Sequence, residues 1–156
     1  DDENNIYPLD VLMDKYEKSV GRNATLILGL TPAPTGLLPT GDVQRLKEMG
    51  DEINRRFVSP IAQTAGQKKS LPLKFGKKQP VNYCIIQENI KNGERIRQYK
   101  VEAKVNGKWK TVCTGESVGH KRIEKFEPVE ATALRLTVLE STALPDIINF
   151  STYSVQ

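Results

Sequence analysis

The sequence predicts a mainly β protein, an antiparallel β-sandwich that follows a shorter helix–strand–helix segment. Apolar residues occupy every second position from Tyr99 to Val105, the period of a strand with one face in a core. Short strands separated by turn residues are expected between positions 71 and 153, a pattern typical of sandwiches and barrels. Residues 1–58 instead show helical spacing on either side of a continuous apolar run.

The first 58 residues predict two helices with a buried strand between them. Residues 24–30 are nearly all apolar, which favours a strand covered on both faces, as in a parallel sheet beneath helices. Helix, strand and helix in this order make one repeat of a β/α barrel or doubly wound sheet, and one repeat cannot bury its own strand. The helical positions are Leu9, Leu12, Met13, Tyr16 and Val20, then Val43, Leu46, Gly50, Ile53 and Phe57.

A polar, irregular stretch over residues 59–70 is interpreted as a linker, and residues 71–156 as the sandwich. Asn106-Gly107 is a strong signal for a tight hairpin turn. A two-residue loop would place Trp109 on the solvent face, and a three-residue bulged loop would place it in the core, so we expect the bulged loop. The expected strands cover residues 71–75, 81–87, 96–105, 108–114, about 118–126, 134–139 and 147–153.

The charge pattern argues against nucleic acid and membrane partners. The net charge of +4 is spread over strands in which lysines and arginines alternate with glutamates, as on a solvated face. The basic runs at residues 77–78 and 120–122 are too short for a nucleic-acid footprint. No stretch is long and apolar enough to cross a membrane, and no signal segment opens the chain.

The cysteines and the histidine do not predict a metal or thiol site. Cys84 and Cys113 both fall inside expected strands, so we favour two buried thiols over a disulfide. Neither has a partner at metal-ligand spacing, and His120 is the only histidine in the chain. We therefore expect no zinc site, no cysteine protease and no cofactor. The sequon at Asn23 opens the apolar run, so its occurrence is interpreted as accidental.

Several segments carry a resemblance to a known enzyme family. The runs SVGRNATLILGLTP and GLLPTGDVQRLKEMG resemble the end of the catalytic barrel of family 29 α-L-fucosidases. The runs QENIKNGERI, GKW and SVGHKRI resemble the coagulation-factor 5/8 type C sandwich, a discoidin-like and galactose-binding-like jelly roll that often follows that barrel. In order, these runs occupy residues 19–32, 36–50, 87–96, 107–109 and 117–123.

The resemblance implies that the parent protein is a retaining α-L-fucosidase, exported to the periplasm or the cell exterior. It implies that residues 1–58 are the last helix–strand–helix of the barrel and that the chain packs against its own upstream barrel. Retaining hydrolysis needs two carboxyl groups about 5 Å apart, and neither family motif for them occurs here. No catalytic residue is therefore assigned, and the chain alone is expected to be inactive. The resemblance leaves a structural calcium ion open.

A carbohydrate-binding module that holds glycan near the active site is the alternative role. For that role the candidate contacts to fucosylated or galactosyl glycans are His120, Arg122 and Arg95. A structural reading is favoured for the charges Glu88, Arg95 and Arg135, as an ion pair tying neighbouring strands. The orphaned barrel repeat further predicts self-association through residues 6–57.

Overall fold

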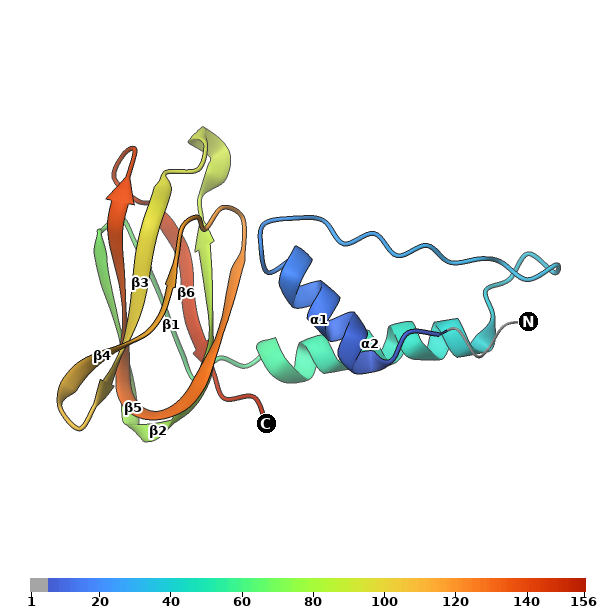
Figure 1. Cartoon of the computed structure of the whole chain (residues 1–156), viewed down its shortest axis with the longest axis horizontal. Coiled ribbons are helices and arrows are strands. Elements are labelled where there is room, and N and C mark those ends of the chain that lie inside the picture. The colour runs from blue at the N-terminus through green and yellow to red at the C-terminus, as the bar shows by residue number, and fades with distance from the viewer. Residues whose placement is uncertain (1–5) are drawn as a thin grey trace.

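The computed structural model describes residues 6–156 and shows a β-sandwich from which a helical arm extends to one side (Figure 1). Within these residues, six strands form an antiparallel sheet in the order β1-β6-β2-β5-β3-β4, which folds over into two layers. The mainly β class predicted from the sequence is confirmed. The elements are α1 (Leu9–Ser19), α2 (Thr40–Phe57), β1 (Ala62–Gly66), β2 (Ser70–Glu88), the 3₁₀ turn η2 (Ile90–Asn92), β3 (Ile96–Val105), β4 (Lys108–Gly115), β5 (Arg122–Ser141) and β6 (Ile147–Tyr153).

Strands β2 and β5 belong to both layers because they are long, 19 and 20 residues. Residues 83–88 of β2 pair with β6, whereas residues 70–74 pair with residues 133–137 of β5. The register of β2 against β5 is irregular between Lys74 and Gln79, which allows the strand to bend. One layer therefore holds β1, β6 and the end of β2, and the other holds β3, β4 and the end of β5.

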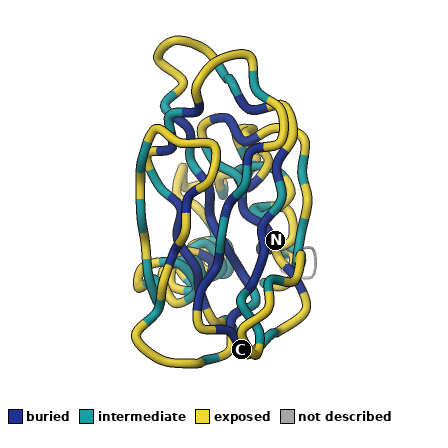
Figure 2. Tube along the Cα trace, turned by 90° about the vertical axis from the view of Figure 1, so that its left-hand side faces the viewer, coloured by how far each residue is buried: buried dark blue, intermediate teal, exposed yellow. Residues whose placement is uncertain are grey.

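The hydrophobic core lies between the layers, along the inner faces of the strands (Figure 2). Tyr99, Val101 and Ala103 are fully buried, as the alternating pattern predicted. Phe150 of β6 belongs to the same cluster, so both layers contribute to it. Burial of this apolar surface is the main force that holds the two layers together.

The hairpin between β3 and β4 corrects the expected bulged loop. Asn106 and Gly107 form a two-residue turn with φ angles of 49° and 81°, the left-handed backbone that such a turn needs. Trp109 consequently pairs with Lys104 and lies half-buried on the outer face instead of in the core.

A bulge farther along β4 explains why the sequence pattern misled. Val112 has no partner in β3, so the faces of β4 exchange at this point. Cys113 then pairs with Val101 and packs against the core, although Trp109 faces outward. One strand thus presents its tryptophan to one face and its cysteine to the other.

The helical arm confirms the two expected helices and corrects the strand between them. Residues 24–30 form an extended segment without strand partners among residues 6–156. The nearest strand-like pairing is a single bridge between Arg22, which precedes this segment, and Arg122. Leu26 and Leu28 pack against the small cluster that α1 and α2 form, but Ile27 is 84% exposed. A strand requires a neighbouring strand for its backbone hydrogen bonds, and the described residues place none beside this segment.

Several boundaries in the sandwich also differ from expectation, and the strands expected at about 118–126 and 134–139 are parts of the single strand β5. The stretch expected as a linker, residues 59–70, contains β1, which pairs with β6 at the edge of the sheet. The strands expected at 71–75 and 81–87 are parts of the single strand β2. Short polar strands such as β1 carry little hydrophobic signal, because their stability comes from pairing with a neighbour.

Candidate functional site

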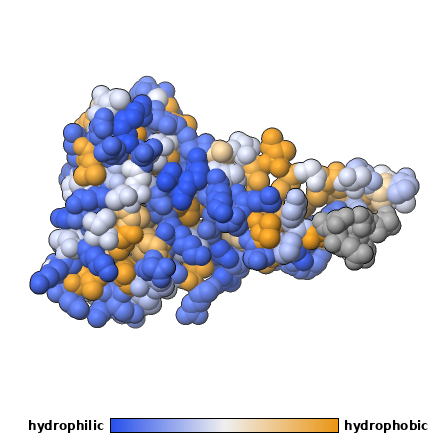
Figure 3. Space-filling model, in the orientation of Figure 1, coloured by the Kyte–Doolittle hydropathy of each residue, from blue (hydrophilic) through white to orange (hydrophobic). Residues whose placement is uncertain are grey.

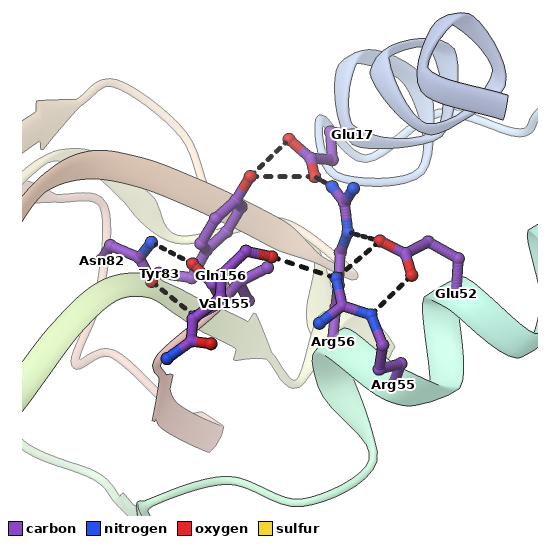
Figure 4. A network of polar contacts seen from close by, with 8 residues as sticks. All are labelled: Glu17, Glu52, Arg55, Arg56, Asn82, Tyr83, Val155 and Gln156. Atoms are coloured by element: carbon purple, nitrogen blue, oxygen red, sulfur yellow. Dashed lines mark hydrogen bonds and ion pairs between the residues drawn. The ribbon is translucent and has the colours of Figure 1, made fainter. Parts of the chain in front are cut away.

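The junction between the helical arm and the sandwich contains a network of charged and hydroxyl groups (Figure 4). The carboxylate of Glu17 on α1 accepts a hydrogen bond from Arg56 Nη1 on α2 at 2.8 Å. Its oxygens also accept from the hydroxyl of Tyr83 on β2, at 3.1 and 3.3 Å. Glu17 therefore connects both helices to the sandwich.

A second carboxylate fixes the arginines of this network. Glu52 accepts from Arg56 Nε at 2.7 Å and from Arg55 Nε and Nη2 at 2.6 and 2.8 Å. Hydrogen bonding from Arg55 and the charge of Arg56 lower the pKa of Glu52 to about 2, although partial burial opposes the shift. Burial, followed by the charge of Glu17, raises the pKa of Tyr83 to about 12, so the phenol stays a donor at neutral pH.

Aromatic packing surrounds the polar network. Phe57 at the end of α2 meets Tyr83 and Tyr153 edge to face, with ring centroids 5.7 and 5.5 Å apart. These rings belong to a cluster on the outer face of one layer that also includes Ile85 and Ile123. Edge-to-face pairs of this kind add stability beyond the area that they bury. The arm is therefore attached to the sandwich by both apolar and charged contacts.

The chain entering the extended segment forms a second attachment. The carbonyl of Gly21 accepts from the backbone N–H of Ile123 at 2.9 Å, and a Cβ at position 21 would lie 2.9 Å from the Ile123 Cβ. Only glycine permits this approach. Asn23, in the left-handed region at φ 65°, accepts from the His120 N–H at 2.7 Å and donates to Glu94 at 2.5 Å. The sequon asparagine is thus engaged with the sandwich.

The arm presents apolar side chains that no other described residue covers, seen as orange atoms beyond the sandwich in Figure 3. Ile27 and Leu37 are 84% and 71% exposed, and Leu30, Leu38 and Val43 are also exposed. A hollow of about 320 Å³ between the helices and the extended segment is lined by apolar residues together with Lys15, Asp42 and Arg45. Exposed apolar groups concentrated in one segment mark an interaction surface. We call the surface formed by the exposed side chains of Ile27, Leu30, Leu37, Leu38 and Val43 the arm face.

The expected glycan contacts do not converge on one binding pocket. His120 is exposed, and its backbone rather than its ring contacts Asn23. Arg122 donates to the buried Glu124 at 2.7 Å, and Arg95 donates to the carbonyl of Leu144 at 2.8 Å. Two of the three candidates are therefore held by the protein itself.

The charges expected as one ion pair are separated. The buried carboxylate of Glu88 accepts from the backbone N–H groups of Arg95 and Ile96, at 2.8 and 3.3 Å, and not from an arginine side chain. Arg135 pairs with Glu102 instead, with nitrogen–oxygen distances of 3.0 and 2.8 Å. Arg135 does form a carboxylate–arginine pair between neighbouring strands, as expected, but its partner is Glu102 and not the predicted Glu88.

Sequence reasoning missed the junction network completely. Arg56 and Tyr83 lie 39 and 66 positions after Glu17 in the sequence, so no local pattern links the three residues. The pairing of Glu52 with Arg55 and Arg56 could have been predicted, since residues three and four positions apart are neighbours on a helix.

Across residues 6–156, no three His, Cys, Asp or Glu side chains gather as a metal site would require. Neither α1 nor α2 is long and apolar enough to cross a membrane.

Comparison with known proteins places these features in context. Residues 49–150 match the F5/8 type C domain. Alpha-L-fucosidase 1 of Arabidopsis thaliana is 27% identical over 94% of this chain, and a second plant relative, from Oryza sativa, is 28% identical over 92%. The chain spans about a third of the length of these curated relatives, 36% and 34%.

Solved structures show the same partial coverage. A Bacteroides thetaiotaomicron protein assigned as an α-L-fucosidase is 86% identical with a TM-score of 0.99, over all of this chain and 36% of that protein. A glycoside hydrolase 29 family member from a rumen bacterium is 32% identical with a TM-score of 0.88, over 99% and 30%. A family 29 fucosidase of Ruminococcus gnavus, solved with fucose, is 25% identical with a TM-score of 0.84, over 96% and 37%.

Proposed function

Because this chain belongs to the F5/8 type C domain family and matches part of longer α-L-fucosidases, we propose that it supports the catalytic barrel of such an enzyme. The observation that carries this proposal is the contrast between the two sides of the arm. One side is fixed to the sandwich by Glu17, Arg56 and Tyr83. The other, the arm face, leaves apolar side chains exposed. On this proposal the arm connects the sandwich to an apolar surface of the catalytic barrel.

The partner that fits the arm face is the rest of a β/α barrel. Residues 25–30 form no strand ladder with any residue of 6–156, and a neighbouring barrel strand would supply the missing hydrogen-bond partners. Helices α1 and α2 flank this segment through Leu26 and Leu28, as crossover helices flank a barrel strand. On this proposal the sandwich steadies the end of the barrel, and the parent protein is exported.

The chain itself is proposed to have no hydrolytic activity. Retaining hydrolysis needs two free carboxyl groups about 5 Å apart, one of them with a raised pKa. The carboxylates at the junction do not offer this, because Glu17 and Glu52 are each held by arginine. Turnover of a chromogenic α-fucoside by the purified chain, above a buffer control, would contradict the proposal.

Docking of the arm face can be tested by placing the same substitutions in two contexts. Ile27→Asp with Leu37→Asp should leave the unfolding of the isolated chain nearly unchanged, since both side chains already face water. At the matching positions of the full-length Bacteroides thetaiotaomicron relative, the pair should lower the melting temperature by several degrees, because charge would then enter a buried interface. Leu139→Asp with Ile148→Asp, at two positions on the sandwich that are each 52% exposed, serves as the control. An equal response in both contexts would refute the docking.

In the isolated chain the arm face has no barrel to cover it, so self-association through residues 6–57 is the expected substitute. Light scattering at increasing protein concentration should show a rising mass, and the double aspartate variant should remain monomeric. A parent chain that is monomeric at every concentration would remove this part of the proposal.

Calorimetry with fucose and galactose tests the alternative function, a carbohydrate-binding module. Saturable heat from either sugar would favour that role.

A further inference from the structure

The outer face of the layer opposite the arm carries an unusual row of side chains. Lys74 on β2 pairs with Ala133 on β5, and Lys104 on β3 pairs with Trp109 on β4. Ala103 pairs with Leu134, so Lys104 lies beside Ala133 and the four residues cross the sheet in one line. Residues directly opposite one another on neighbouring strands project from the same face. A small residue therefore separates two lysines, with the only tryptophan of the chain at the end of the row.

The row forms a hollow. Its volume is about 160 Å³, and it is lined by Pro72, Lys74, Phe75, Lys104, Trp109, Thr132 and the buried Ala133. The hollow exists because Ala133 has no side chain beyond Cβ, whereas both of its cross-strand neighbours are long. Two aromatic residues and two lysines therefore line a space of about the size of a single sugar ring, smaller than a site for drug-sized ligands.

The tryptophan wall is held in place by a chain of charge interactions. The guanidinium of Arg135 lies 4.3 Å from the centroid of the Trp109 ring. Glu102 fixes that guanidinium with two hydrogen bonds, at 3.0 and 2.8 Å, and accepts from Lys100 at 2.9 Å. Glu102 thus pairs with both cations and holds Arg135 against the indole, and none of these three residues lines the hollow.

The two lysines of the hollow, by contrast, have no acidic partner within the described residues. Lys104 lies 6.0 Å from the Trp109 centroid, where it adds positive charge beside the ring. The hollow thus combines an oriented aromatic wall with two uncompensated ammonium groups. Aromatic rings contact the apolar faces of sugar rings, and paired cations favour an anionic substituent.

We propose that this hollow binds an anionic saccharide, with the sugar ring against Trp109 and its carboxylate or sulfate group between Lys74 and Lys104. A single tryptophan and a space for one ring do not suit a nucleic-acid strand, which requires a series of stacking platforms. The hollow involves β3 and β4, and Figure 1 shows β4 on the side of the sandwich away from the helices of the arm. Binding here is therefore independent of the docking proposed for the arm face, and either can fail without the other.

Trp109 makes the proposal directly measurable, because it is the only tryptophan and its emission reports on the hollow. The isolated chain is titrated with tetragalacturonate and, separately, with a sulfated galactotetraose, and neutral galactotetraose is the reference. We expect a saturable change in Trp109 emission with a charged oligosaccharide and none with the neutral one. The two charged probes distinguish a uronate from a sulfated sugar. The apparent affinity should fall as salt rises from roughly 0.02 to 0.2 M.

Matched variants locate the binding. Lys74→Gln with Lys104→Gln should weaken the affinity about tenfold or more, since each charge-assisted hydrogen bond is worth about that factor. Lys108→Gln with Lys110→Gln removes the same charge from exposed positions of β4 that alternate with Trp109, and should change the affinity less than about twofold. Ala133→Leu fills the hollow and should abolish the emission change while leaving the melting temperature near that of the parent.

Three outcomes would overturn the proposal. Equal binding of the neutral and charged oligosaccharides would show that the lysines do not select the ligand. Equal weakening by the two double lysine variants would show diffuse attraction to a basic surface. Inorganic sulfate that binds as tightly as the charged oligosaccharides would show an anion site without a saccharide.

Discussion

The helical arm and the sandwich differ in how completely they bury their apolar side chains. In the sandwich both layers turn apolar side chains inward, so Tyr99, Leu134 and Phe150 are completely buried. In the arm only Leu12, Met13 and Met49 reach comparable burial, and Ile27 is left in water. The sandwich therefore covers its main core with its own two layers, whereas the described residues of the arm meet the sandwich only at the junction. The difference shows that the arm depends on contacts with other parts of the protein. At one end these contacts are with the sandwich, and on our proposal the rest of the arm contacts a barrel.

The core of the sandwich should show the largest effect. Phe150→Ala empties an aromatic position between the layers and should lower the free energy of unfolding by about 3–5 kcal/mol. Thermal or denaturant unfolding measures this loss, and Leu139→Ala at an exposed position of β5 should change stability by less than about 0.5 kcal/mol. If Phe150→Ala cost no more than the control, the sandwich would not be the self-sufficient unit of the molecule.

The junction should show an intermediate effect that is confined to the arm. Glu17→Gln removes the charge that Arg56 pairs with and weakens the acceptor of Tyr83, at a cost of about 1–3 kcal/mol. Hydrogen exchange should then accelerate in α1 and α2 while the strands keep their protection. Asp51→Asn, which alters the exposed pair of Lys47 and Asp51 within α2, is the control. Unchanged exchange in the arm of the Glu17 variant would mean that aromatic packing alone holds it.

Acid should weaken the arm before it weakens the sandwich. The folded pKa of Glu52 is about 2, below its ordinary value of 4.5, so its contribution is present above pH 4.5 and is lost as the pH falls towards 2. Solvent screening limits this contribution to about 1 kcal/mol. Circular dichroism of the helices across this interval measures the effect, and Glu52→Gln should abolish it. An arm that is equally stable at both ends of the interval would contradict the assignment.

A buried carboxylate gives the sandwich a small response of the opposite sign. Burial raises the pKa of Glu88, and the N–H groups of Arg95 and Ile96 only partly oppose the shift. Its stabilising form is therefore protonated, and stability declines as the pH rises through the folded pKa. Glu88→Gln retains an acceptor for both N–H groups and should raise stability at neutral pH by less than about 1 kcal/mol. Glu88→Ala, which leaves both donors unpaired, should be destabilising; equal losses in the two variants would exclude this explanation.

Much of the sandwich could be predicted because its signals are local. The alternation from Tyr99 to Val105 determines which face of β3 is buried, and Asn106-Gly107 determines where the chain turns. The helical spacing before residue 58 likewise predicted α1 and α2. These patterns depend on neighbouring residues, and a short stretch of chain already contains the period of its own secondary structure.

The tertiary structure decided the features that depend on distant partners. The two-residue turn places Trp109 on the outer face, whereas the bulge at Val112 turns Cys113 towards the core, which no pattern in β4 reveals, since a bulge is set by the register against β3. The apolar run at residues 24–30 had the composition of a buried strand, yet it lacks strand neighbours among residues 6–156. The junction of Glu17, Arg56 and Tyr83, and the row from Lys74 to Trp109, arise only when separate strands and helices meet. Sequence alone determines the periodicity of each element, whereas the pairing of elements determines which side chains meet, because backbone hydrogen bonds and charge pairs are satisfied between segments far apart in the chain.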